Sequence, residues 1–111
     1  MSVNSVSLTP EEAKELCYVF EAGYRDINEQ GAYLLRAEIL PIEPRIVATL
    51  RRPLIELSDE EAGTLLVVLE RGHQRKRAFI DNLQYRGRAP LEQLKRKLRS
   101  VAGLEETQGT A

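Results

Sequence analysis

The chain has 111 residues, 42% of them hydrophobic and 30% charged, and its 16 basic and 17 acidic side chains leave a formal net charge of −1. This length fits one domain that buries roughly two-thirds of its unfolded surface and folds without metal or disulfide staples. The longest apolar run, Leu65 to Leu69, is far too short to span a bilayer, and the N-terminus carries no export signal. The only cysteine, Cys17, lies in an apolar stripe, which indicates a buried, reduced thiol. We therefore expect a cytoplasmic protein without membrane contact.

The first predicted helix begins with a capping box. Thr9 is followed three residues later by Glu12, so that each side chain can accept a backbone N–H of the other, and Pro10 suits the first helical position. Apolar residues then recur at helical spacing. Gly31 either ends this helix or weakens it by about 1 kcal/mol, in which case the helix continues to about Ile39.

Prolines break up the segment that follows. Pro41 must end the first helix, and Pro44 and Pro53 interrupt any long element after it. The apolar residues of 45–50 fit either a short helix or a strand. We favour a short helix, and the choice over residues 42–56 stays open.

A second long helix is predicted from Asp59 to about Tyr85, with Ser58 and Glu61 forming another capping box. Around residues 72–76 its apolar face is interrupted by Gly, His and Lys, so a polar interaction is expected there. Its predicted buried face consists of Ala62, Leu65, Leu66, Leu69, Phe79, Ile80 and Leu83.

The last predicted helix starts at Pro90, after a loop over residues 86–88. Apolar residues recur in it at steps of three and four. These elements predict an all-α fold, a small helical bundle of two long and two shorter helices in a single domain. Residues 8–104 are expected to be ordered, with flexible tails at 1–7 and 105–111. The apolar residues of the last helix are Leu91, Leu94, Leu98 and Val101.

The two long helices resemble each other at an offset of 49 residues. A duplicated helical hairpin would explain this, but so would coincidence, because any two capped amphipathic helices share several residue types. The sequence leaves both explanations open. The matching pairs are Leu16 with Leu65, Val19 with Val68, Glu21 with Glu70, Gly23 with Gly72, and Tyr24 with His73.

The sequence contains few residues of the types and spacings that catalysis requires. His73 and Cys17 are the only residues of their types, they fall on different predicted helices, and no phosphate-binding loop, nucleophile motif or paired-ligand motif occurs. We therefore expect no enzyme activity, no cofactor and no metal. His73 is interpreted first as a partly buried, hydrogen-bonded residue, and second as a pH-sensitive or base-stacking contact.

Charge is distributed unevenly along the chain. Residues 71–99 contain ten Lys or Arg against two acidic residues, whereas residues 1–70 contain thirteen acidic and six basic ones. If the last two helices are antiparallel neighbours, these cations can form one stripe that attracts an anionic partner. The candidate partner-binding residues are Arg71, His73, Arg75, Lys76, Arg77, Tyr85, Arg86, Arg88, Lys95, Arg96 and Arg99.

These observations predict a small non-enzymatic regulatory or adaptor protein that binds an acidic protein surface through its basic C-terminal helical face. One alternative is a nucleic-acid-binding protein, in which the same stripe holds phosphates while Tyr85 stacks on an unpaired base. Another is an architectural homodimer, in which the acidic half of one chain lies against the basic half of the other.

Overall fold

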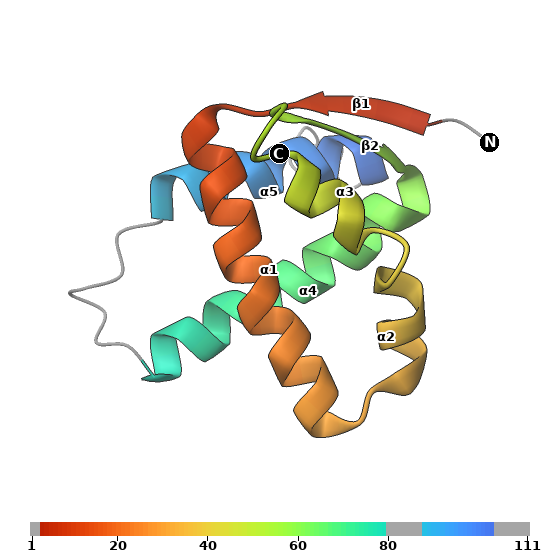
Figure 1. Ribbon diagram of the computed structural model, residues 1–111, viewed down its shortest axis with the longest axis vertical. Coiled ribbons are helices and arrows are strands. Elements are labelled where there is room, and N and C mark those ends of the chain that lie inside the picture. Colours follow the sequence, from red (N-terminus) through yellow and green to blue (C-terminus); the bar gives the residue numbers. More distant parts are fainter. Residues whose placement is uncertain (1–2, 80–87, 104–111) are drawn as a thin grey trace, which may run out of the picture.

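The computed structural model describes the backbone of residues 3–79 and 88–103, and the side chains of residues 3–75 and 90–103. The fold is mainly helical, as predicted, and it also contains a small sheet that the sequence analysis did not predict (Figure 1). The elements in order are β1 (Val3–Ser7), α1 (Pro10–Gln30), α2 (Tyr33–Ile39), α3 (Glu43–Ala48), β2 (Leu54–Ser58), α4 (Asp59–Phe79) and α5 (Arg88–Ala102).

The strands β1 and β2 pair with each other in antiparallel register, with Val6 opposite Ile55. Alternate residues face the core, where Val6, Ile55 and Leu57 are buried, while Ser5 and Glu56 face solvent. Residues 3–7, which the sequence analysis placed in a flexible tail, therefore form a strand, and the all-α prediction did not account for the two strands. Each strand has only five residues. A pattern this short becomes recognisable only once its partner strand is known.

The helix α1 ends at Gln30 and is capped by Gly31, which was one of the two predicted alternatives. Gly31 has a positive φ of 70°, which favours glycine. The N–H of Gly31 donates to the carbonyl of Asn28 and that of Ala32 donates to Ile27, which together make a Schellman motif. The chain then turns into the separate helix α2, so the first helix does not continue to Ile39.

The segment 42–56 contains both of the structures between which the sequence could not decide. Residues 43–48 form the helix α3, as favoured, and residues 54–58 form β2. The last helix begins at Arg88, two residues before the predicted start at Pro90, so Arg88 belongs to α5 and not to a loop. In α5, Leu91, Leu94 and Leu98 are fully buried, as their spacing predicted. The proposed end of the second helix at Tyr85 lies outside the described residues.

The two long helices cross closely at a pair of glycines. A Cβ added to Gly72 would overlap the carbonyl oxygen of Val19, and one added to Gly23 would overlap the carbonyl oxygen of Val68. The apolar face of α4 is therefore interrupted at Gly72 because the backbone of α1 occupies the space of a side chain. The polar interactions that the sequence analysis expected here are made by the neighbouring His73, which approaches Lys95 on α5, and by Arg75, which bonds to Glu29 on α1.

The offset of 49 residues that relates the two long helices also relates their contacts. The contact of Val19 with Gly72 becomes that of Val68 with Gly23 when the two halves are exchanged. The resemblance at this offset thus extends from residue types to helix–helix contacts. Buried residues that match across the halves include Val6 and Ile55, Leu8 and Leu57, Ala13 and Ala62, Leu16 and Leu65, Val19 and Val68, and Phe20 and Leu69.

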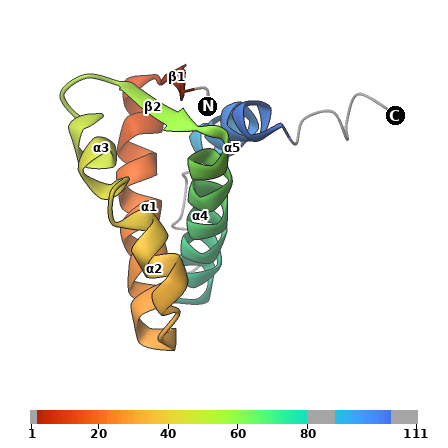
Figure 2. The same cartoon turned by 90° about the vertical axis from the view of Figure 1, so that its right-hand side faces the viewer.

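A single apolar core joins all of these elements. It lies between α1 and α4, is closed at one end by the sheet, and is covered by α2 and α3 on one side and by α5 on the other (Figure 2). The sheet and the first turns of α1 and α4 lie at the same end, next to α5. This arrangement brings β1, the N-terminus of α1 and α5 together.

We predict that Gly72→Ala destabilises the protein although Ala is the better helix former. Overpacking should outweigh the gain in helix propensity and lower the free energy of unfolding by about 1–3 kcal/mol. Urea denaturation measures this. The matched control is Gly63→Ala in the same helix, where a Cβ would meet nothing within 4 Å, and this change should be neutral or stabilising. Equal effects at the two positions would contradict the close crossing.

Candidate interaction surface

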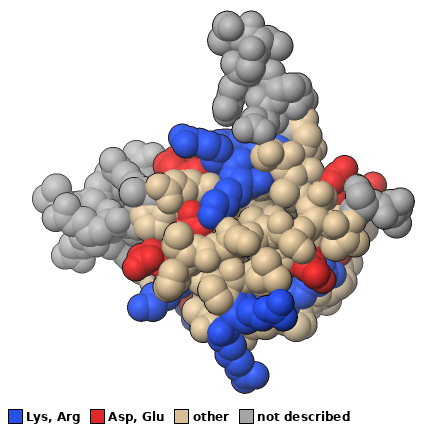
Figure 3. Space-filling model, turned by 90° about the horizontal axis from the view of Figure 1, so that it is seen from above, with Lys and Arg blue, Asp and Glu red and all other residues tan. Residues whose placement is uncertain are grey.

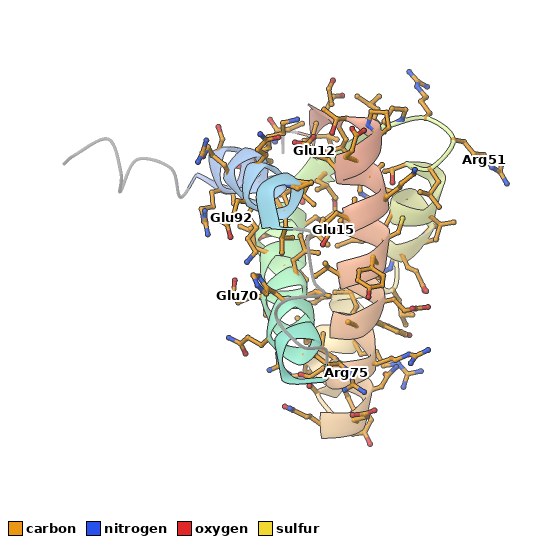
Figure 4. The ribbon with its side chains drawn as sticks, turned by 90° about the vertical axis from the view of Figure 1, so that its left-hand side faces the viewer. Glu12, Glu15, Arg51, Glu70, Arg75 and Glu92 are labelled. Carbon is orange, nitrogen blue, oxygen red and sulfur yellow. The ribbon has the colours of Figure 1, made fainter. Side chains whose placement is uncertain are left out.

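Two of the predicted partner-binding residues hold α4 against α1. Arg75 donates two hydrogen bonds to the carboxylate of Glu29, at 2.8 and 2.9 Å, and its guanidinium lies 3.9 Å from Asp26. Arg71 lies 3.5 Å from the same Asp26. Figure 4 shows Arg75 between the two helices, near their lower ends. These two cations are therefore engaged by the acidic residues of the first half of the chain.

Lys95 is turned inward from α5 toward α4. Its side chain is only 4% exposed, and its ammonium group donates to Glu70 at 2.8 Å and lies 3.4 Å from Nδ1 of the half-buried His73. The hydrogen bond from Lys95 lowers the pKa of Glu70 below its usual value. A side chain buried to this extent offers little surface to a partner.

The remaining predicted residues divide into two groups. Arg96 and Arg99 lie on α5, where Arg96 is exposed and Arg99 half-buried. The other group lies outside the part of the chain with described side chains. This group comprises Lys76, Arg77, Tyr85, Arg86 and Arg88.

Both predicted capping boxes form. The Thr9 hydroxyl accepts the N–H of Glu12 at 3.1 Å and the Glu12 carboxylate accepts the N–H of Thr9 at 2.9 Å. Ser58 and Glu61 make the same two bonds at the same distances. In the first box Glu12 is 1% exposed, and its Oε2 has no hydrogen-bond partner among the described residues.

Each capping box is held by a cation from another helix, which the sequence analysis did not anticipate. Lys97 of α5 donates to Glu12 at 2.7 Å and to the carbonyl oxygen of Ser7 at 2.8 Å. Figure 4 shows Glu12 at the top of α1, on the side that faces α5. Lys97 thus ties α5 to both β1 and α1.

Arg45 of α3 holds the second capping box in the same way. It donates two hydrogen bonds of 2.8 Å to the Glu61 carboxylate and one of 2.8 Å to the carbonyl oxygen of Glu56. Glu12 and Glu61, and likewise Ser7 and Glu56, are 49 residues apart, so the two bridges are equivalent. Only the spacing of the capping boxes was visible in the sequence, because Arg45 and Lys97 do not share that offset.

These bonds shift the ionisation of Glu61. The Arg45 hydrogen bonds, with smaller contributions from Ser58, lower the pKa of Glu61 from 4.5 to about 2. The carboxylate is consequently charged throughout the ordinary pH range, and the bridge to Arg45 persists until the solution is strongly acidic.

An open hollow lies between β1 and α5, which we call the α5 hollow. Its volume is about 530 Å³, and it is lined by Ser5, Ser7, Arg96, Lys97 and Ser100 together with the apolar side chains of Val6 and Val101. Seen from above the sheet, Lys and Arg atoms gather where α5 lies, at the upper edge of the face in Figure 3. Among the described residues, no acidic side chain forms an ion pair with Arg96 or Arg99.

A second hollow, which we call the α3 hollow, lies on the other side of the sheet. Its volume is about 540 Å³, close to that of the first, but its charge is opposite. Arg45 is its only cation among the described residues, against three carboxylates. The lining residues are Val3, Arg45, Glu56, Ser58, Glu60 and Glu61.

Within residues 3–75 and 90–103 no group of three or more His, Cys, Asp or Glu side chains is placed to hold a metal ion. Cys17 is a free, partly buried thiol whose Sγ donates to the carbonyl oxygen of Ile46 at 3.4 Å, and burial raises its pKa. Across the described part of the chain, no helix has both the length and the apolar character needed to cross a membrane.

Comparison of the chain with protein-family models, with curated proteins and with solved structures finds no match to any of them.

We predict that Glu61 makes the stability of the protein depend on pH in acid. Its pKa is lower in the folded than in the unfolded state, so its contribution is fully present above about pH 4.5 and is lost as the pH falls toward 2. In Glu61→Gln the free energy of unfolding should fall less steeply over this range. Urea denaturation at several pH values measures the slope.

The control for this experiment is Glu60→Gln. Glu60 is an exposed neighbour that, among the described residues, forms no ion pair, so its replacement should leave the slope nearly unchanged. Equal slopes for Glu61→Gln and the unmodified protein would mean that the Arg45 bridge does not form in solution.

Proposed function

We propose that this chain is a small non-enzymatic regulatory or adaptor protein that binds an acidic protein partner through the exposed side of α5. The observation that carries the proposal is the state of Arg96 and Arg99. They belong to the predicted basic set, and within the described residues no acidic side chain pairs with either of them. The proposed surface is the α5 hollow together with these two arginines.

Internal ion pairs limit the proposed binding surface to the part of the basic set that lies on the exposed side of α5. Arg71, Arg75 and Lys95 already contact Asp26, Glu29 and Glu70, so their charge is largely compensated within the chain. A partner would have to displace these carboxylates before it could use the cations. Binding through Arg96 and Arg99 does not require an internal ion pair of this kind to be broken first, so it costs less free energy.

A protein partner fits the charge distribution better than a nucleic acid does. A nucleic-acid backbone is a continuous polyanion that needs a long run of cations. Here the α3 hollow, across the sheet from α5, carries three glutamates and would repel it. A protein that presents a local acidic group can contact α5 without approaching those glutamates.

The homodimer alternative receives no specific support. It requires the acidic half of one chain to pair with the basic half of another, but the pairs of Arg71, Arg75 and Lys95 with acidic residues form within one chain. Three of the cations that would hold such a dimer are therefore already engaged within the chain.

We predict that the double charge reversal Arg96→Glu with Arg99→Glu lowers the retention of partners about tenfold or more, because attraction at two positions becomes repulsion. Tagged protein is purified from its native cells, with and without nuclease, and the co-purified proteins are quantified. Circular dichroism and urea denaturation establish that the variant is folded.

The matched control reverses Arg51 and Arg52, two exposed arginines whose replacement changes the net charge equally. Arg51 projects from the side of the molecule opposite to α5 (Figure 4). This variant should retain the partners. Unchanged retention by the α5 variant would refute the proposal, and loss of all partners after nuclease treatment would favour the nucleic-acid alternative.

A further inference from the structure

The α5 hollow combines two cations with three hydroxyl groups. Arg96 and Lys97 come from α5 together with Ser100, whereas Ser5 and Ser7 come from β1. All five side chains can donate hydrogen bonds, and among the described residues that line the hollow none is a carboxylate. A concave surface with this composition is suited to an oxyanion.

Lys97 keeps one donor for such a ligand. Its ammonium group has three N–H bonds, of which one is donated to Glu12 and one to the carbonyl oxygen of Ser7. Glu12 partly neutralises this cation, so the uncompensated charge of the hollow comes from Arg96. Because Glu12 and Ser7 hold Lys97 in place, its remaining N–H is positioned before any ligand arrives.

The backbone of β1 adds two more donors. The N–H of Leu8 bonds to the carbonyl of Pro53, so alternate residues of β1 direct their backbone groups toward β2. Ser7 points the other way, as its carbonyl bond to Lys97 shows. By the same alternation, the N–H groups of Ser5 and Ser7 face α5.

The α3 hollow serves as a reference within the molecule. It has nearly the same volume, lies beside the equivalent strand and contains the equivalent cation bridge, made by Arg45. Its lining nevertheless includes Glu56, Glu60 and Glu61, so its charge repels anions. The strand and the capping-box bridge correspond in the two halves, and of these two hollows the α5 hollow has the composition of an anion site.

We propose that the α5 hollow binds the phosphoryl group of a phosphorylated Ser or Thr in a protein partner. The inference rests on the proposed function, since it names the group that the acidic partner presents to α5. A phosphomonoester carries nearly two negative charges and three acceptor oxygens, which use more of these donors than the two oxygens of a carboxylate. The hollow spans a few residues of one strand and about two turns of one helix, so it fits one such group and not an extended polyanion.

The test measures the binding of a short alanine-flanked phosphoserine peptide by the shifts of backbone amide signals in NMR spectra, at constant ionic strength. The same peptide with Ser or Glu in place of phosphoserine, and a short oligothymidine, are titrated in parallel. We expect saturable shifts in residues 5–7 and 96–101 and none in residues 56–61. The affinity order should be phosphoserine, then Glu, then Ser.

Arg96→Gln should weaken the phosphoserine peptide about fivefold or more, because a charge-assisted hydrogen bond is lost. Ser100→Ala should weaken it about twofold, as expected for a neutral donor of roughly half that strength. Arg51→Gln, which removes an equal charge elsewhere on the surface, should leave it unchanged. Equal losses for Arg96→Gln and Arg51→Gln, shifts that never saturate, or tighter binding of oligothymidine than of the phosphopeptide would each overturn the proposal.

The outcome can be separated from that of the proposed function. If the phosphopeptide fails to bind but charge reversal on α5 still releases partners, only the phosphoryl subsite is refuted. If the phosphopeptide binds at the α5 hollow but charge reversal releases no partner, the subsite stands and the proposed docking function is refuted.

Discussion

Where α1 crosses α4, the backbone of each helix fills the place that a side chain on the other would occupy. Gly23 and Gly72 permit this approach, and the carbonyl groups of Val68 and Val19 lie against them. The crossing fixes the separation of the two halves and therefore the positions of the strands that precede each helix. The β1–β2 pair and the α5 helix, which packs on α4 and α1, take their places from it. A site built between β1 and α5 consequently depends on two glycines far from it.

Much of the helical framework could be predicted from local signals. The capping boxes at Thr9 and Ser58 placed both long helices, and the spacing of Leu91, Leu94 and Leu98 identified the buried side of α5. The strands were not predicted because their stabilisation comes from pairing between segments about 50 residues apart. The candidate site was predictable only in part. The excess of cations is a property of sequence, but whether each meets an acidic partner depends on tertiary contacts, as Arg75 and Glu29 illustrate.

The resulting charge distribution differs from the one that composition suggests. The acidic first half and the basic last third do not face outward as two poles. They meet across the α1–α4 and α4–α5 contacts, where Asp26, Glu29 and Glu70 receive Arg71, Arg75 and Lys95. Pairs of this kind are partly exposed and contribute modestly to stability. Their larger effect is on recognition, because among the described residues of the predicted basic set they leave Arg96 and Arg99 without an acidic partner.

The bridges made by Lys97 and Arg45 also protect the sheet. A two-stranded sheet has two outer edges, and an unpaired edge invites the strand of another molecule, which is a common route to aggregation. Here the outward carbonyl of Ser7 is occupied by Lys97 and that of Glu56 by Arg45, so each edge is interrupted by a charged side chain of its own chain. Detachment of α5 would remove this protection from β1, and intermolecular β-association would then begin at that strand.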